Sequence, residues 1–192
     1  MQQVDEVTRS LVAEETRARI LEAAQVAFSN VGYARAVVRD IAEAADVAPS
    51  LIMHYFSSKE SLFEEAFANV LDMADILTVP RENFGDNALS LLTATHNDTV
   101  RASAMLAQSI ADRQTKDIAV RLMKDEVIGP VASWLEGPHG NARAQIIAML
   151  TLGFAAFRIL IPLGDPDSGD DHYVNQWTSR ALQRLAETPD FL

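Results

Sequence analysis

Apolar residues recur at steps of three and four along almost the whole chain of 192 residues, which is the spacing of one helix face. No convincing stretch alternates apolar and polar residues as a strand would. The first apolar stripe spans residues 13–31 and is followed by Gly32, a residue suited to a helix C-terminus. The pattern predicts an all-α protein. On the polar face of this first helix we expect Arg17, Arg19, Glu22 and Gln25.

Short polar segments, several with Pro or Gly, separate the later apolar stripes. Ser57 and Glu60 have the spacing of a capping box at the start of one of them. The segment "VPRENFGD", residues 79–86, predicts a linker ahead of a larger helical bundle. We divide the chain into an N-terminal domain, residues 1–60, and a C-terminal helical domain, residues 61–192. Further helices are predicted at residues 38–45, 49–55, 60–78, 87–96, 99–112, 116–135, 142–163 and 172–187.

The two short helices at residues 38–45 and 49–55 have the layout of a helix-turn-helix, although many helical hairpins share this spacing. Such a motif needs a small apolar core that fixes the angle between two helices and leaves the second free to enter the major groove. Pro49 suits the first turn of the second helix. The spacing therefore makes this segment a candidate helix-turn-helix within an N-terminal three-helix domain. The residues expected to form its core are Ile41, Ala42, Ala45, Val47, Ile52 and Phe56.

The stretch "RILEAAQVAFSNVGY" followed by "VRDIAEAADVAPSLIMHYFSSKESLF" resembles the DNA-binding domain of the TetR (tetracycline-repressor) family of bacterial regulators. The resemblance covers residues 16–67, and the rest of the chain agrees in length and helical character. It implies a homodimeric, ligand-responsive transcription regulator, most often a repressor of a palindromic operator. A two-fold dimer is suited to this task because it reads two half-sites about 34 Å apart.

The resemblance also implies which residues contact DNA. Arg39 matches a contact to a base edge or a phosphate, and Tyr55 and Lys59 match phosphate contacts. The others lie on the exposed edge of the recognition helix or at the mouth of the groove. The positions are Arg39, Ala48, Pro49, Ser50, Leu51, His54, Tyr55 and Lys59.

Three positions depart from the family pattern. Val37 stands where a Thr usually caps the second helix, and Ala48 stands where a Ser often caps the third. The loss of such a cap typically costs about 1 kcal/mol of helix stability. Met53 replaces a frequent Tyr and so removes a potential contact to DNA.

The net charge of −11 raises the question of how the protein approaches a polyanion. Residues 1–60 hold six basic and nine acidic residues, a net charge of −3, so a net charge of −8 lies in the rest of the chain. Screening at physiological salt has a length of about 8 Å, so remote carboxylates barely oppose phosphates at the groove. We expect a local positive face formed by Arg17, Arg39 and Lys59. With so few cations, few phosphates are neutralised and the salt dependence of binding should be shallow.

The C-terminal domain is expected to bind a small-molecule effector between its helices. Ligand binding would reach the DNA-binding domain through the helix predicted at residues 60–78. The last two helices carry more apolar surface than one bundle needs, and the resemblance implies that they form an intermolecular four-helix interface. The candidate ligand-binding residues are His96, Arg101, Met105, Met123, Trp134, Phe154 and Phe157.

No enzyme motif accompanies these features. The sequence lacks a P-loop, a dinucleotide fingerprint, a nucleophile elbow and a protease zinc motif. Glu136 and His139 have a spacing found in di-iron bundles, but Gly137 and Pro138 interrupt the helix that would align them. We therefore expect no catalysis, no cofactor and no metal.

A cytoplasmic location is expected for the protein. The chain contains no cysteine, and the N-terminal "MQQVDEVTRSLVAEE" has no apolar segment of the secretory kind. The most apolar run, residues 146–163, contains Arg158 and Pro162, so we interpret it as a buried helix and not a membrane span. A second function class stays open: a helical small-molecule-binding or adaptor protein whose DNA-binding module is degenerate.

Overall fold

The structure, a computed structural model, describes residues 2–94, 98–161 and 168–187. Most of the described residues are helical, and no strand occurs among them, which confirms the prediction of an all-α fold. Two of the helical segments are π-helical and one is a 3-10 turn. In chain order the elements are α1 (Gln2–Arg35), α2 (Val38–Ala44), α3 (Pro49–Phe56), α4 (Lys59–Val70), α5 (Ala74–Leu77), η1 (Arg81–Asn83), α6 (Phe84–Thr93), α7 (Asp98–Ile110), α8 (Arg113–Leu122), η2 (Met123–Ile128), α9 (Gly129–Leu135), α10 (Gly140–Ala155), η3 (Ala156–Leu160) and α11 (Gly169–Glu187).

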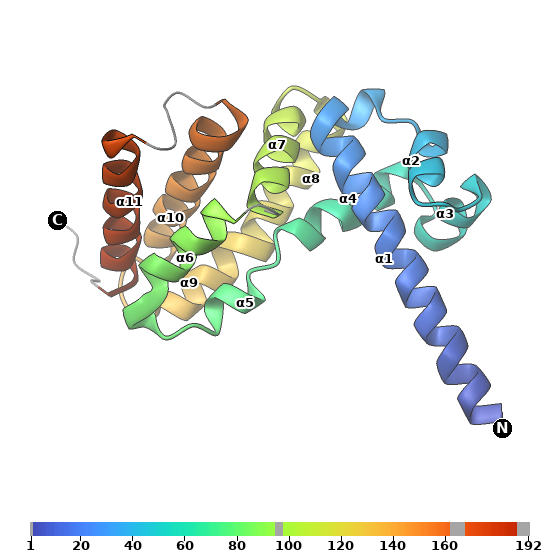
Figure 1. The fold of residues 1–192 in the computed structure, drawn as a ribbon, viewed down its shortest axis with the longest axis horizontal. Coiled ribbons are helices and arrows are strands. Elements are labelled where there is room, and N and C mark those ends of the chain that lie inside the picture. Colours follow the sequence, from blue (N-terminus) through green and yellow to red (C-terminus); the bar gives the residue numbers. More distant parts are fainter. Residues whose placement is uncertain (1, 95–97, 162–167, 188–192) are drawn as a thin grey trace.

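The molecule is elongated, with the short helices α2 and α3 at one end and α10 and α11 at the other (Figure 1). Between these ends lie α4, α7 and α8, and the N-terminal turns of α1 project away from the rest. This arrangement places the predicted DNA-binding module at the opposite end of the molecule from the two helices predicted to form the dimer interface.

Two apolar clusters support the two ends. The first joins α1 to α4 with α7 and α8, and includes the fully buried Phe28, Phe63 and Met105. The second joins α6 with α9, α10 and α11 around Phe84 and Leu182. Since the first cluster contains residues from both predicted domains, the helix-turn-helix shares its core with the body of the protein.

α1 follows the predicted stripe but differs from the prediction in two respects. It begins at Gln2, ahead of the predicted start, and its regular backbone is broken at Gly32, where φ is 75°. The break confirms the expected helix end. Gln25 was expected on the polar face, but that prediction was wrong, because its side chain is only 4% exposed. It lies on the side of α1 that packs against α4 and α7.

The helix predicted at residues 60–78 is two helices. Its cap is Ser58, whose hydroxyl accepts from the Ser61 backbone N–H, and not the predicted Ser57, which lies in the corner at a φ of 62°. α4 ends at Val70, and the Asp72 carboxylate then accepts from a backbone N–H at the start of α5. An Asp side chain that bonds the backbone in this way favours a turn over a continuous helix, so no single rod crosses this region.

The prediction of a linker at residues 79–86 is also wrong, because the segment contains η1 and the start of α6 and buries Phe84 and Gly85. Phe84 is 1% exposed and its ring lies 4.9 Å from that of Trp134, centroid to centroid. Arg81 lies over the same indole ring at 5.2 Å. Composition alone suggested a spacer, but one aromatic side chain with a distant partner anchors the segment.

The helix predicted at residues 116–135 contains a π-helical segment, Met123–Ile128, which ends two residues before Pro130. Proline has no N–H to donate and its ring clashes with the carbonyl four residues earlier, which widens the preceding turn. After α9, Glu136 and His139 adopt positive φ angles of 50° and 60°. None of the described helices has the length and apolar character needed to cross a membrane.

Candidate nucleic-acid interface and ligand cavity

α2 and α3 meet at a tight corner around a small core. Ile41, Ala42, Ile52 and Phe56 are all buried, as the sequence predicts for a helix-turn-helix. The corner depends on Asp46, which adopts a φ of 52°, a left-handed conformation that Asp tolerates better than most residues. A backbone bond of 3.0 Å from the Val47 N–H to the Ala42 carbonyl then closes the turn.

The outer side of α3 is open to solvent. Ser50, Met53 and His54 are exposed, while Leu51 and Tyr55 are half-buried. Because Ile52 and Phe56 point into the core, the helix is fixed by its inner side and presents the outer one. This is the arrangement that entry of a helix into a groove requires.

Neither helix has a side-chain cap. Val37 and Ala48 occupy the N-cap positions of α2 and α3 with extended backbones and make no side-chain cap bond, as their apolar side chains predict. The first-turn N–H groups of both helices therefore lack the side-chain acceptor that a Thr or Ser would supply.

The three cations predicted to share the DNA-facing surface differ in their surroundings. Arg17 pairs with Glu65 on α4 and lies over the Phe56 ring, so much of its charge is compensated within the protein. Lys59 has its Nζ 4.5 Å above the centre of the Tyr33 ring. Partial burial lowers the pKa of Lys59, and the nearby Asp112 carboxylate opposes that shift. Arg39, by contrast, is exposed and has no hydrogen-bond or ion-pair partner among the described residues.

A cavity of about 220 Å³ lies between α4, α5, α6, α7 and α10. It is slightly smaller than the range of roughly 300–1,000 Å³ common for small-molecule sites. Its wall is mainly apolar, with aspartates and two threonines among the lining side chains. The residues that line it are Val70, Asp72, Met73, Asp75, Ile76, Phe84, Ala88, Leu91, Leu92, Ala94, Asp98, Thr99, Ile147 and Thr151.

Both parts of the chain match family models. Residues 20–66 match the model described as "Bacterial regulatory proteins, tetR family". Residues 82–185, more than half of the chain, match "Tetracyclin repressor-like, C-terminal domain". The chain belongs to the TetR family. Members of this family are transcriptional regulators, typically DNA-binding repressors.

Curated relatives match over the DNA-binding part. The chain is 38% identical over 71 residues to the HTH-type transcriptional regulator TtgR of Pseudomonas putida, a match that covers 37% of this chain and 34% of the relative. It is 33% identical over 73 residues to the HTH-type transcriptional regulator BetI 2 of Chromohalobacter salexigens, covering 38% and 35% of the two chains. The matched stretch thus spans about a third of the length of each relative.

Solved structures share the fold over most of the chain. A putative TetR-family transcriptional regulator from Rhodococcus sp. has a TM-score of 0.66 at 19% identity, covering 91% of this chain and 100% of its own. Salmonella enterica GusR has a TM-score of 0.61 at 17% identity, covering 90% and 95%. NalD, the secondary repressor of the MexAB-OprM multidrug efflux pump in Pseudomonas aeruginosa, has a TM-score of 0.57 at 20% identity, covering 88% and 97%.

The predicted ligand-binding residues do not gather at the cavity of this TetR-family protein. Met105 and Phe154 are buried in the two apolar clusters, and Met123 packs against the first of them. Trp134 packs against Phe84 beside the second cluster, with the two rings tilted by 37°. Phe157 lies on the outer surface. The set as a whole stays a prediction.

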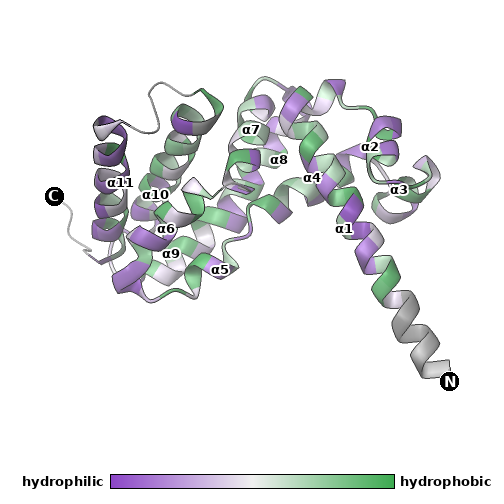
Figure 2. Ribbon diagram, viewed as in Figure 1, coloured by the Kyte–Doolittle hydropathy of each residue, from purple (hydrophilic) through white to green (hydrophobic). Residues whose placement is uncertain are grey.

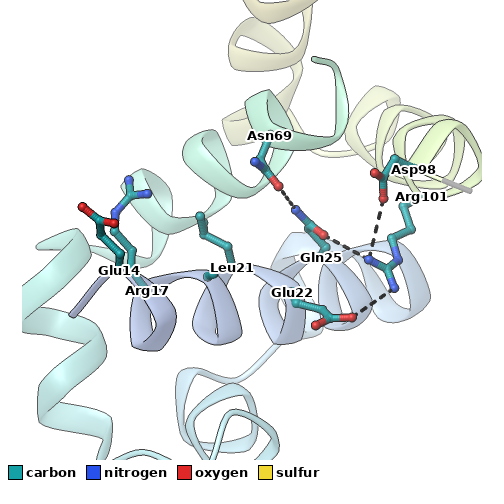
Figure 3. A pocket seen from close by; sticks show the side chains of 9 residues that line it. Glu14, Arg17, Leu21, Glu22, Gln25, Asn69, Asp98 and Arg101 are labelled. Carbon is teal, nitrogen blue, oxygen red and sulfur yellow. Dashed lines mark hydrogen bonds and ion pairs between the residues drawn. The ribbon is translucent and has the colours of Figure 1, made fainter. Parts of the chain in front are cut away.

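The two polar candidates have different outcomes. His96 lies outside the described residues. Arg101 lies in a groove between α1, α4 and α7, where it bonds Gln25 and faces Glu22 and Asp98 (Figure 3). Sequence reasoning missed Gln25, although one signal pointed to it: it follows Leu21 by one helical turn on the buried side of α1.

The helices at the far end expose an apolar stripe. α10 is mostly apolar and α11 mostly hydrophilic (Figure 2). Even so, Phe157 is 55% exposed and Trp177 is 53% exposed. The other large apolar side chains exposed on these elements and directly after them are Ile146, Met149, Leu160, Ile161, Tyr173 and Val174.

Proposed function

We propose that this TetR-family protein is a ligand-responsive repressor that binds a palindromic operator as a homodimer. The observation that carries the proposal is α3, whose Ile52 and Phe56 are buried while Ser50 and His54 on its outer side are open to solvent. A helix held in this way has polar side chains available for base edges. On this proposal the domain boundary lies near residue 60, and the protein acts in the cytoplasm without catalysis.

The DNA contacts divide by chemistry. Ser50 and His54 offer hydrogen-bonding groups to base edges, and the half-buried Leu51 offers an apolar contact. Tyr55 and Lys59 are assigned to phosphates, and the unpaired Arg39 to a phosphate or a base. Ala48 and Pro49, both exposed at the start of α3, let the DNA backbone approach closely.

Dimerisation is supported by the apolar stripe on α10 and α11. Ile146 and Met149 on α10 are followed at steps of four, four and three by Gly153, Phe157 and Leu160, which places these positions on one face of α10 and η3. Exposed apolar patches of this kind typically mark protein interaction sites. A second copy of the chain, bringing the same stripe, would complete a four-helix contact under two-fold symmetry.

The effector site is assigned to the cavity between α4 and α10. It combines apolar walls with a few polar groups, the usual composition of a small-molecule site. Its small volume suits a compact ligand or one that displaces the wall as it enters. A library screened by thermal shift would identify such a ligand, because binding raises apparent stability by mass action.

The DNA-binding proposal is tested by selecting duplexes from a random library and measuring their affinity by fluorescence anisotropy. We expect a palindromic site, with Lys59→Ala weakening binding to all duplexes and lowering the salt slope by about 1 per half-site. Arg39→Ala should also weaken binding. Lys124→Ala in η2, an exposed lysine outside the helix-turn-helix, serves as the control. Failure to retain any duplex at low salt would favour a helical adaptor protein instead.

A further inference from the structure

One amide side chain connects three helices at the junction between the DNA-binding module and the body (Figure 3). The Nε2 of Gln25 on α1 donates to the Asn69 Oδ1, directly before the end of α4, over 2.7 Å. The Nη1 of Arg101 on α7 donates to the Gln25 Oε1 over 3.1 Å. Both ends of the Gln25 amide are therefore in use.

Because Gln25 is buried, its two hydrogen bonds constrain the position of α1 relative to α4 and α7. Gln25 is 4% exposed and lies among the apolar residues that pack α1 against α4 and α7. An apolar contact tolerates small sliding, but a buried amide that loses a partner is left as an unsatisfied, desolvated polar group, which is unfavourable. α1 therefore has one position, relative to the other two helices, in which Gln25 is satisfied.

Arg101 reaches this amide from the helix turn that forms part of the cavity wall. Asp98 and Thr99, in the first turn of α7, line the cavity, and Arg101 follows them by less than one turn. Its guanidinium lies between two carboxylates, 3.7 Å from Glu22 Oε1 on α1 and 3.8 Å from Asp98 Oδ1. A displacement of this turn by a ligand would move the guanidinium and change its contact with Gln25.

We propose that Arg101 is a positioning residue that, through Gln25, couples the effector cavity to the orientation of α1 and of the helix-turn-helix packed on it. This inference rests on the proposed function and adds the route by which the site acts. Ligand entry shifts the first turn of α7, Arg101 loses its bond to Gln25, and α1 changes its angle to α4. In a dimer the separation of the two α3 helices changes with it, so ligand and operator weaken each other reciprocally.

The test measures the distance between the DNA-binding module and the body directly. The chain has no cysteine, so Glu43→Cys on α2 and Lys124→Cys in η2 give two specific spin-label sites in the full protein. Labelled protein is diluted with an excess of unlabelled protein, so that only distances within one chain are recorded by double electron–electron resonance. We expect Arg101→Met and Gln25→Leu to shift or broaden the distribution, and Arg101→Lys to do so less.

Arg121→Met is the matched control. It removes the 2.9 Å ion pair between Arg121 on α8 and Glu64 on α4. This ion pair contacts neither α1 nor the cavity. We expect its distance distribution to equal that of the unmodified chain. A distribution for Arg101→Met that also equals the unmodified one, with only the melting temperature lowered, would show that Arg101 merely stabilises the fold and would overturn the inference.

Operator affinity supplies the second measurement. On a duplex selected by the unmodified protein, Arg101→Met should bind about 3- to 30-fold more weakly, while Arg121→Met binds normally. If the unmodified protein selects no duplex, the proposed function fails while the label distances still decide the inference. If it does select one and Arg101→Met binds that duplex equally well, the inference fails and the proposed function stands.

Discussion

Arg143 makes a buried contact whose removal has a calculable consequence. This arginine of α10 is 4% exposed and points at the C-terminal turn of α11. Its Nε and Nη2 donate to the Leu185 carbonyl over 2.9 and 2.7 Å, and Nη2 also donates to the Ala186 carbonyl over 2.9 Å. Nη1 donates to the Glu136 carbonyl at the end of α9 over 3.3 Å. One guanidinium thus caps two helix C-termini, where carbonyl groups lack partners.

The expected cost of replacing Arg143 by Met follows from these contacts. A hydrogen bond to a charged group contributes about 1.5–3 kcal/mol, so losing the two carbonyls of α11 gives roughly 3–6 kcal/mol. Part of this loss is offset, because the folded protein no longer has to bury the charged guanidinium of Arg143 away from water. Burial lowers the pKa of Arg143, and the positive charge of Arg81 lowers it further, so both disfavour the charged form. Removing a buried charge recovers several kcal/mol of desolvation, so we expect a net loss of about 2–4 kcal/mol.

Urea unfolding followed by far-ultraviolet circular dichroism measures this loss. All variants must be compared at one protein concentration, because the stability of a dimer depends on it. Arg121→Met, which breaks an exposed ion pair, should lose less than about 1 kcal/mol. If Arg143→Met were no less stable than Arg121→Met, the carbonyl caps would not be what holds α11 against α9 and α10.

Three further outcomes are expected. Gly153→Glu should be a monomer in light scattering, with unchanged helicity. An added Cβ there meets nothing within 4 Å in one protomer, and the position lies on the apolar stripe of α10. Gly153→Ala should remain dimeric, and a dimeric Gly153→Glu would contradict the interface. As the pH rises, DNA affinity should begin to decline sooner for the unmodified chain than for Lys59→Arg, because the lowered pKa of Lys59 means that it loses its proton and charge first. Superimposable curves of affinity against pH would exclude a role for Lys59. Gly85→Ala should lower the free energy of unfolding by about 1–3 kcal/mol in thermal melts, because its Cβ would lie 2.2 Å from the Ser179 carbonyl oxygen; an unchanged melting temperature would mean that α6 and α11 separate freely.

The helix-turn-helix could be predicted from the sequence because its determinants are local. Ile41, Ala42, Ile52 and Phe56 lie within 16 consecutive residues and pack on one another and on α1. Caps and corners follow from single residues, so the absence of caps at α2 and α3 was also predictable. The wrong cap at Ser57 arose because two adjacent serines offer the same hydroxyl and only the backbone conformation selects between them.

Long-range packing explains what sequence reasoning missed. Phe84 sits in a segment whose composition is that of a linker, and only its distant partner Trp134 makes it part of a core. Gln25 is polar, so a two-sided reading of α1 placed it outside. Whether an apolar side chain fills a core, as Met105 does, or lines a cavity, as Ile76 does, depends on how closely other helices approach.

The distribution of charge gives the junction at Gln25 its importance. Arg17 is occupied by Glu65, so Arg39 and Lys59 are the cations of the predicted face that remain for DNA. On the proposed function, so few phosphate contacts provide little sequence-independent affinity. A strongly basic protein would stay bound to DNA through phosphate contacts after its recognition helices moved out of register, but this protein would lack that sequence-independent affinity. A small change in the angle of α1 would therefore be enough to release the operator.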